Sequence, residues 1–163
     1  MNPAIVPAPQ LSRSPFEDRP RRVLIVDDNE VDQELTVELL RRAWPLERSS
    51  LIVDQTGDGF EALRRLRATK YALVLLDWNM PGVSGADVLR VLRTWTAHPP
   101  VIVLSGVPPE RLRSELGGTG IASLDKNTLT PAALRREVLI TFGLAGPWPT
   151  GLPSDEGRER AVS

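Results

Sequence analysis

Two stretches of the chain decide its fold: residues 23–30 read VLIVDDNE, and residues 73–85 read LVLLDWNMPGVSG. Each stretch starts as an unbroken apolar run and then changes abruptly to acidic and turn-forming residues. Unbroken apolar runs are typical of strands that are buried on both faces of a parallel sheet. The two stretches therefore predict parallel strands whose carboxyl ends carry acidic side chains.

Further apolar runs and amphipathic segments alternate along the rest of the chain. Besides residues 23–26, the strand candidates are residues 50–53, 71–76, 101–104 and 121–124. The helix candidates run from about residue 30 to 43, after Asp58, through Ala86, Leu89 and Leu92, from Pro108, and after Thr130. This order predicts an α/β fold of the (βα)5 type: an open, doubly wound parallel sheet between two helix layers, with the second strand at an edge.

Details of three helix candidates make the prediction specific. In residues 30–43, Val31, Leu35 and Leu39 recur four residues apart, which predicts one apolar helix face. Asp58 and Thr130 are residues that favour the N-cap position, so each is expected to begin a helix.

Composition narrows the class of protein. The 163 residues are about one domain in length and carry 20 basic and 21 acidic side chains, a net charge of −1. A nucleic-acid-binding domain would normally show a basic excess. The chain has no cysteine, which excludes disulfides, thiolate nucleophiles and Cys-based zinc sites. Neither a secretory signal nor a run long enough to cross a membrane is visible, so a cytoplasmic protein is expected.

Prolines mark the limits of the expected domain. They are concentrated in residues 1–20 and, together with glycines, in residues 144–163. Proline lacks the N–H that helices and sheets need, so both ends are expected to be flexible arms. The packed domain is therefore predicted to span residues 21–143.

Polar side chains follow the predicted strands where each one ends. Asp27 and Asp28 follow the first strand, Asp77 the third, and Lys126 the fifth. Because the carboxyl ends of parallel strands share one edge of the sheet, these groups are expected to meet there. Clustered carboxylates without His or Cys favour Mg²⁺ over zinc. A carboxylate can also attack phosphorus, and a lysine can neutralise the transferred group.

The fourth strand adds a hydroxyl and a glycine to this edge. Ser105 can donate a hydrogen bond to a phosphoryl oxygen, and Gly106 lets the backbone approach closely. Lys126 is one of only two lysines among the 20 basic residues, which favours a site that needs a compact point charge.

These motifs at these spacings resemble the receiver domain of two-component response regulators, over about residues 21–143. The resemblance implies a flavodoxin-like fold with strand order 2-1-3-4-5. It also implies that Asp77 is the phosphoacceptor. Mg²⁺ would be bound by Asp28, by Asp27 directly or through water, by Asp77 and by the main-chain carbonyl of Asn79. Ser105 would bind the phosphoryl group, and Lys126 would pair with Asp77 and then with the phosphate.

The resemblance further implies a phosphodonor, a sensor histidine kinase. Since residues 144–163 are too few for a DNA-binding domain, a single-domain regulator that signals through protein contacts is expected, with no enzymatic turnover beyond slow autodephosphorylation. A homodimer is left open, and no nucleic acid or membrane is expected as a partner. The alternatives are a phosphorylation-independent interaction module, a phosphate sink or relay, and an aspartate-based phosphatase, for which the motif spacing fails.

Three residues depart from the receiver pattern. Asn127 stands where receivers usually have a proline in a cis bond, so the loop is either trans and reshaped or strained. Ser123 stands where an aromatic residue usually reports phosphorylation. Trp78 directly follows the expected acceptor, and either a gate at the mouth of the site or an exposed contact for a partner is expected.

Overall fold

The computed structural model describes residues 21–45, 50–117 and 120–144. The two expected arms, residues 1–20 and 144–163, lie outside these ranges apart from residue 144.

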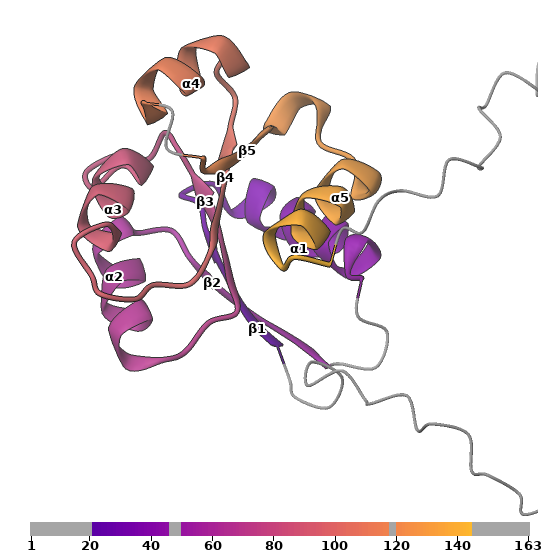
Figure 1. Cartoon of the computed structure of the whole chain (residues 1–163), viewed down its shortest axis with the longest axis horizontal. Coiled ribbons are helices and arrows are strands. Elements are labelled where there is room, and N and C mark those ends of the chain that lie inside the picture. Colours follow the sequence, from indigo (N-terminus) through magenta and orange to yellow (C-terminus); the bar gives the residue numbers. More distant parts are fainter. Residues whose placement is uncertain (1–20, 46–49, 118–119, 145–163) are drawn as a thin grey trace, which may run out of the picture.

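The described part of the chain is built on a five-stranded parallel sheet (Figure 1). The strands are β1 (Arg21–Val26), β2 (Leu51–Thr56), β3 (Leu73–Asp77), β4 (Val101–Ser105) and β5 (Ala122–Asp125). Their spatial order is β2-β1-β3-β4-β5, so the predicted topology, with β2 at an edge, is confirmed. The last four residues of β1 and all residues of β3 and β4 are buried, which is why these stretches appear as apolar runs.

Helices cover both faces of the sheet, giving the expected three layers. They are α1 (Glu30–Ala43), α2 (Gly59–Ala68), α3 (Gly85–Leu92), α4 (Pro109–Leu116) and α5 (Pro131–Thr141), with a short 3₁₀ helix, η1 (Lys126–Thr128), after β5. Figure 1 shows α2 and α3 on one face and α1 and α5 on the other. Two separate hydrophobic clusters fill the spaces between these layers, one on each face of the sheet.

The predicted helix starts are confirmed by their hydrogen bonds. The Asp58 side chain accepts from the backbone N–H of Glu61, and the Thr130 side chain accepts from that of Ala133. At α1 the cap is Asn29, whose side chain accepts from two backbone N–H groups of the first turn. Because Asn29 serves as the cap, the two preceding aspartates are free for other roles.

The predicted apolar face of α1 is wrong for Val31 and Leu35, whereas Leu39 is partly buried against the core. Val31 and Leu35 are 72% and 55% exposed, whereas the side chains buried against the sheet are Thr36, Leu40 and Ala43. Two of these three buried residues are a threonine and an alanine, so the spacing of large apolar residues does not indicate this face. Val31 and Leu35 instead lie on the outer surface of α1.

Near the amino ends of β1 and β3, a polar cluster links these strands to the edge strand β2. Arg22 on β1 donates to both carboxylate oxygens of Asp54 on β2, at 3.1 and 2.8 Å, and the Tyr71 hydroxyl donates to the same carboxylate at 2.8 Å. This pairing explains how β2 can continue through a charged residue and run three residues beyond its predicted end.

The cluster predicts the titration of Tyr71, the only tyrosine in the chain. Burial, and then the hydrogen bond to Asp54, raise its pKa to about 12, above the value near 10 of an unfolded chain. Spectrophotometric titration should therefore show tyrosinate forming at about pH 12, and Asp54→Asn should lower that pKa. Because the folded pKa is the higher one, the stability linked to Tyr71 is present below about pH 10 and is lost as the pH rises through 12. A pKa near 10 in the folded protein would contradict the buried hydrogen bond.

Candidate functional site

Three aspartates from two neighbouring strands meet at the carboxyl edge of the sheet. Asp27 directly follows β1 and Asp28 comes next, while Asp77 is the last residue of β3. Carboxylate oxygens of the three lie within 4.8 Å of one another. Asp27 and Asp77 are buried and Asp28 is exposed, so the cluster is open to solvent on the side of Asp28.

The ammonium group of Lys126 lies within this cluster. Lys126 begins η1 directly after β5, and its Nζ lies 2.6 Å from Asp27 Oδ2 and 3.2 Å from Asp77 Oδ1. A third carboxylate, that of Asp32 on α1, lies 3.2 Å away. The side chain of Lys126 is only 18% exposed, so its charge is directed into the site and not to bulk solvent.

Burial and mutual charge set the protonation of the site. Burial raises the pKa of Asp77, the charge of Asp27 raises it further, and Lys126 only partly offsets both effects. Burial alone would lower the pKa of Lys126, but the hydrogen bond to Asp27 and the charges of Asp77 and Asp27 raise it overall. Lys126 is therefore charged, but its charge does not fully offset the cost of burying the negative charge of Asp77.

The other predicted site residues lie on the adjoining loops. Ser105 ends β4 and is completely buried, with its hydroxyl accepting from the backbone N–H of Val107 at 3.1 Å. Asn79 is exposed, and its N–H donates to Asp77 Oδ1 at 3.4 Å. Gly106 is exposed at the start of the loop after β4.

The loop after Lys126 takes the trans and reshaped alternative. No peptide bond in the described ranges is cis. Asp125 caps η1 by accepting from the N–H of Asn127, and the Asn127 amide also donates to Asp125 and, at 3.4 Å, to the carbonyl of Gly106. The asparagine thus ties the loop after β5 to the loop after β4 by hydrogen bonds that a proline could not make.

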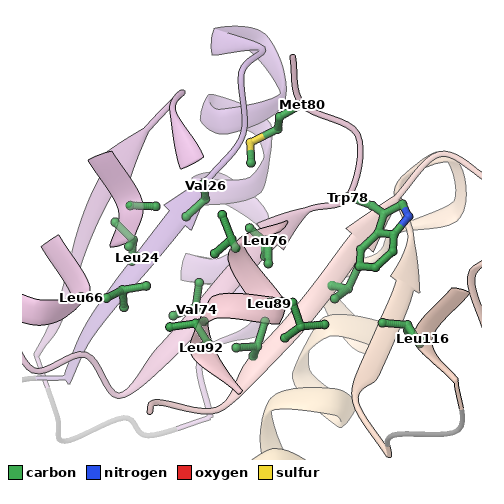
Figure 2. Packing of buried hydrophobic residues seen from close by; sticks show 14 of the residues in the cluster. Leu24, Val26, Leu66, Val74, Leu76, Trp78, Met80, Leu89, Leu92 and Leu116 are labelled. Carbon is green, nitrogen blue, oxygen red and sulfur yellow. The ribbon is translucent and has the colours of Figure 1, made fainter. Parts of the chain in front are cut away.

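Trp78 is not an exposed contact for a partner. Only 7% of it is exposed, and it belongs to the hydrophobic cluster beneath α3 and α4. In Figure 2 the indole of Trp78 and the side chain of Met80 belong to the same hydrophobic cluster, with the indole on the side of Leu116. Its Nε1 donates to Glu115 Oε2 on α4 at 2.6 Å, which links the residue after Asp77 to that helix. Ser123, at the usual position of the aromatic, lies within β5.

The contacts made by Asp32 and Glu115 were not predicted from the sequence. Asp32 lies in the first turn of α1, where an acidic residue is expected to interact with the helix dipole, and Glu115 lies in the last turns of α4. Their partners are 94 and 37 residues distant in the chain, so no local spacing indicates either contact.

The donor set fits a hard divalent cation. Asp27, Asp28 and Asp77 each offer one carboxylate oxygen, and no His or Cys joins them among the described residues. Oxygen ligands of this kind suit Mg²⁺, and one exposed member leaves room for water ligands. Asp27, Asp28 and Asp77 are therefore the residues that would hold such an ion.

Comparison with known proteins decides the family. Residues 23–124 match the response regulator receiver domain. The chain belongs to this family. The match includes residues of all five strands, from Val23 to Leu124, and contains Asp27, Asp28, Asp77 and Ser105, although it ends two residues before Lys126.

Individual relatives agree with the match. The chain is 34% identical over 128 residues to protein-glutamate methylesterase/protein-glutamine glutaminase 5 of Myxococcus xanthus, covering 76% of the chain and 34% of that protein. It is 36% identical over 85 residues to the cell cycle transcriptional regulator CtrA of Caulobacter vibrioides, covering 52% and 34%. The chain thus spans about a third of the length of these relatives.

A solved structure shows the same fold. The response regulator TrrA of Thermotoga maritima, crystallised with Mg²⁺ and BeF, is 27% identical, with a TM-score of 0.62 over 74% of this chain and 98% of its own. The receiver domain is therefore of the CheY-like, flavodoxin-like type. Among the described residues of this receiver, no helix is both long and apolar enough to cross a membrane.

Proposed function

We propose that this receiver domain accepts a phosphoryl group on Asp77 from a phosphohistidine of a sensor histidine kinase, with Mg²⁺ bound. The observation that carries the proposal is the position of the Asp77 carboxylate. It is 5% exposed, yet it lies within 4.8 Å of the oxygens of two further aspartates and in an ion pair with Lys126. A buried acidic group in this arrangement suits chemistry more than stability, because its own burial disfavours its charge.

The transfer balances as one displacement at phosphorus. A carboxylate oxygen of Asp77 forms the new O–P bond, the P–N bond to the donor imidazole breaks, and the imidazole nitrogen keeps the electron pair. Lys126 supplies one positive charge to the transferred oxygens, and the buried Ser105 hydroxyl can turn to donate to one of them. Mg²⁺, when bound, neutralises charge on the phosphoryl oxygens and on the carboxylates.

The residues that would hold Mg²⁺ are Asp27, Asp28 and Asp77, with the carbonyl of Asn79 as a further ligand. Gly106 would leave room beside the phosphoryl group. The protein would act as a single-domain regulator in the cytoplasm that signals through protein contacts, without turnover of its own beyond slow hydrolysis of the acyl phosphate. An interaction module without phosphorylation is less favoured, because Asp27, Asp28, Asp77 and Lys126 lie together in one cluster.

The test uses a small phosphodonor, acetyl phosphate, with Mg²⁺ and the full chain. Intact mass should rise by one phosphoryl group, and hydroxylamine should remove it, because an acyl phosphate is cleaved by that nucleophile. Asp77→Asn should abolish the gain because an amide does not form the acyl phosphate.

The matched control is Asp58→Asn. Asp58 lies at the same edge of the sheet, and asparagine is an equally good N-cap, so this variant should still be phosphorylated. A wild-type protein that binds Mg²⁺ but gains no mass, or a gain that persists in Asp77→Asn, would contradict the proposed function.

A further inference from the structure

The ammonium of Lys126 divides its hydrogen bonds unequally among three carboxylates. Its two directed hydrogen bonds go to Asp27, at 2.6 Å, and to Asp32, at 3.2 Å. Its contact with Asp77, also at 3.2 Å, is an ion pair. The ammonium is therefore shared among three carboxylates, and that of Asp32 lies as close to it as the acceptor carboxylate does.

The local structure of α1 explains why Asp32 is free to do this. Asp32 is the third residue of the helix, where an acidic side chain often turns back to accept from the N–H of the cap residue. Here the N–H of Asn29 donates instead to Asp27 Oδ1, at 3.0 Å. The usual partner of Asp32 is therefore already occupied, and its carboxylate is directed to Lys126, 94 residues later in the chain.

We propose that Asp32 is a positioning residue that holds Lys126 on the α1 side of the site and so opposes loading of Asp77. The inference rests on the proposed function of the same site. A phosphoryl group on Asp77 places anionic oxygens beyond its carboxylate, and Lys126 is the cation in contact with that carboxylate. To bind those oxygens, the ammonium must give up part of its interaction with Asp32, whose negative charge also repels the incoming anion.

Removal of this competition should favour anion binding. Asp32→Asn is expected to raise both the rate of phosphorylation by acetyl phosphate at saturating Mg²⁺ and the affinity for beryllofluoride. The expected gain is about threefold to tenfold, which corresponds to about 0.6–1.4 kcal/mol. The matched control is Glu34→Gln, which removes the same charge from an exposed position of α1 that is not an ion-pair partner of Lys126.

A second readout follows Lys126 itself. Lys70 and Lys126 are the only lysines in the chain, so isotope labelling of lysine gives two side-chain NMR signals, and Lys70→Arg assigns them. Asp32→Asn should shift the Lys126 signal in the unphosphorylated protein, whereas Glu34→Gln should leave it in place. A merely structural role of Asp32 in capping α1 would lower thermal stability without this shift and without the gain in affinity.

The outcomes separate this inference from the proposed function. If wild type binds beryllofluoride and Asp32→Asn behaves like Glu34→Gln in affinity and rate, the positioning role is wrong and the proposed function stands. An unmoved Lys126 signal in Asp32→Asn would also overturn the role. If wild type neither binds beryllofluoride nor accepts a phosphoryl group, both the proposed function and the inference fail.

Discussion

Gly85→Ala is expected to destabilise the protein by about 3 kcal/mol or more and to abolish phosphorylation of Asp77. Gly85 is the first residue of α3 and donates its N–H to the carbonyl of Trp78 at 3.1 Å. A Cβ at this position would overlap the carbonyl oxygen of Asp77 and lie 2.9 Å from Trp78 Cα. Both are backbone atoms, so no side-chain rotation can relieve the overlap.

The expected loss is opposite to what helix propensity alone predicts. Alanine is favoured over glycine within a helix by up to about 1 kcal/mol, and Gly85 does not have the positive φ that would exclude a side chain. The overlap must therefore be relieved by moving the backbone of Asp77 or the start of α3. Either movement shifts the acceptor carboxylate relative to Asp27 and Lys126, so stability and phosphorylation should fall together.

Urea denaturation and the mass assay with acetyl phosphate measure the two effects. Gly57→Ala is the control, because the added Cβ would lie 3.5 Å from its nearest neighbours, the carbonyl of Asp27 and Cα of Asp28, which is ordinary contact. This variant adds a methyl group equally close to the site and should retain both properties. A Gly85→Ala protein as stable as Gly57→Ala would show that the loop after β3 is looser than the structure indicates.

The sequence predicts most of this fold because its signals are local. Unbroken apolar runs indicate buried parallel strands, and capping residues such as Asp58 and Thr130 mark helix starts whose hydrogen bonds lie within one turn. The meeting of Asp27, Asp28 and Asp77 was also predictable, because strand ends share one edge whatever the details of packing. The roles that the resemblance implies for these residues remain predictions.

Features that depend on long-range packing could not be predicted in the same way. The buried face of α1 contains Thr36 and Ala43, which are small or polar, so periodicity of large apolar residues pointed to Val31 and Leu35 instead. The buried position of Trp78 involves packing in the cluster beneath α4 and a hydrogen bond to Glu115 on that helix, which begins 31 residues later. In both cases the residues that bury the side chain are distant in the sequence and come close only when the chain folds.

Lys126→Met is expected to destabilise the metal-free protein by about 3 kcal/mol at about pH 7, the lower end of the range for breaking a buried ion pair. Lys126 faces the carboxylates of Asp27, Asp32 and Asp77, and Asp28 lies within the same cluster. Without the ammonium, four carboxylates remain with no cation, and two of them are buried. Methionine keeps most of the length of the side chain, so the effect arises mainly from charge.

The site should respond differently to Mg²⁺, pH and a second substitution than an ordinary packing defect would. Addition of Mg²⁺ should recover most of the lost stability, because the same three aspartates would bind it.

Burial already raises the pKa of Asp77, and loss of Lys126 raises it further. A carboxyl whose folded pKa exceeds its unfolded value destabilises the fold above that pKa, and the penalty disappears as the pH falls through it. Lowering the pH from neutrality in EDTA should therefore stabilise Lys126→Met relative to wild type, and the further change Asp77→Asn should do the same at neutral pH.

Lys70→Met, at the other lysine, is the control for these measurements. Lys70 is exposed outside the site, so its substitution should change stability little and should not make stability more dependent on Mg²⁺ or pH. Urea denaturation of both variants, in EDTA and in Mg²⁺, gives the comparison. If the stability of Lys126→Met in EDTA equals that of Lys70→Met, the ammonium does not compensate the buried carboxylates. If it is lower but Mg²⁺ does not restore it, the loss comes from packing of the lysine side chain, and the charge balance derived from these contacts is wrong.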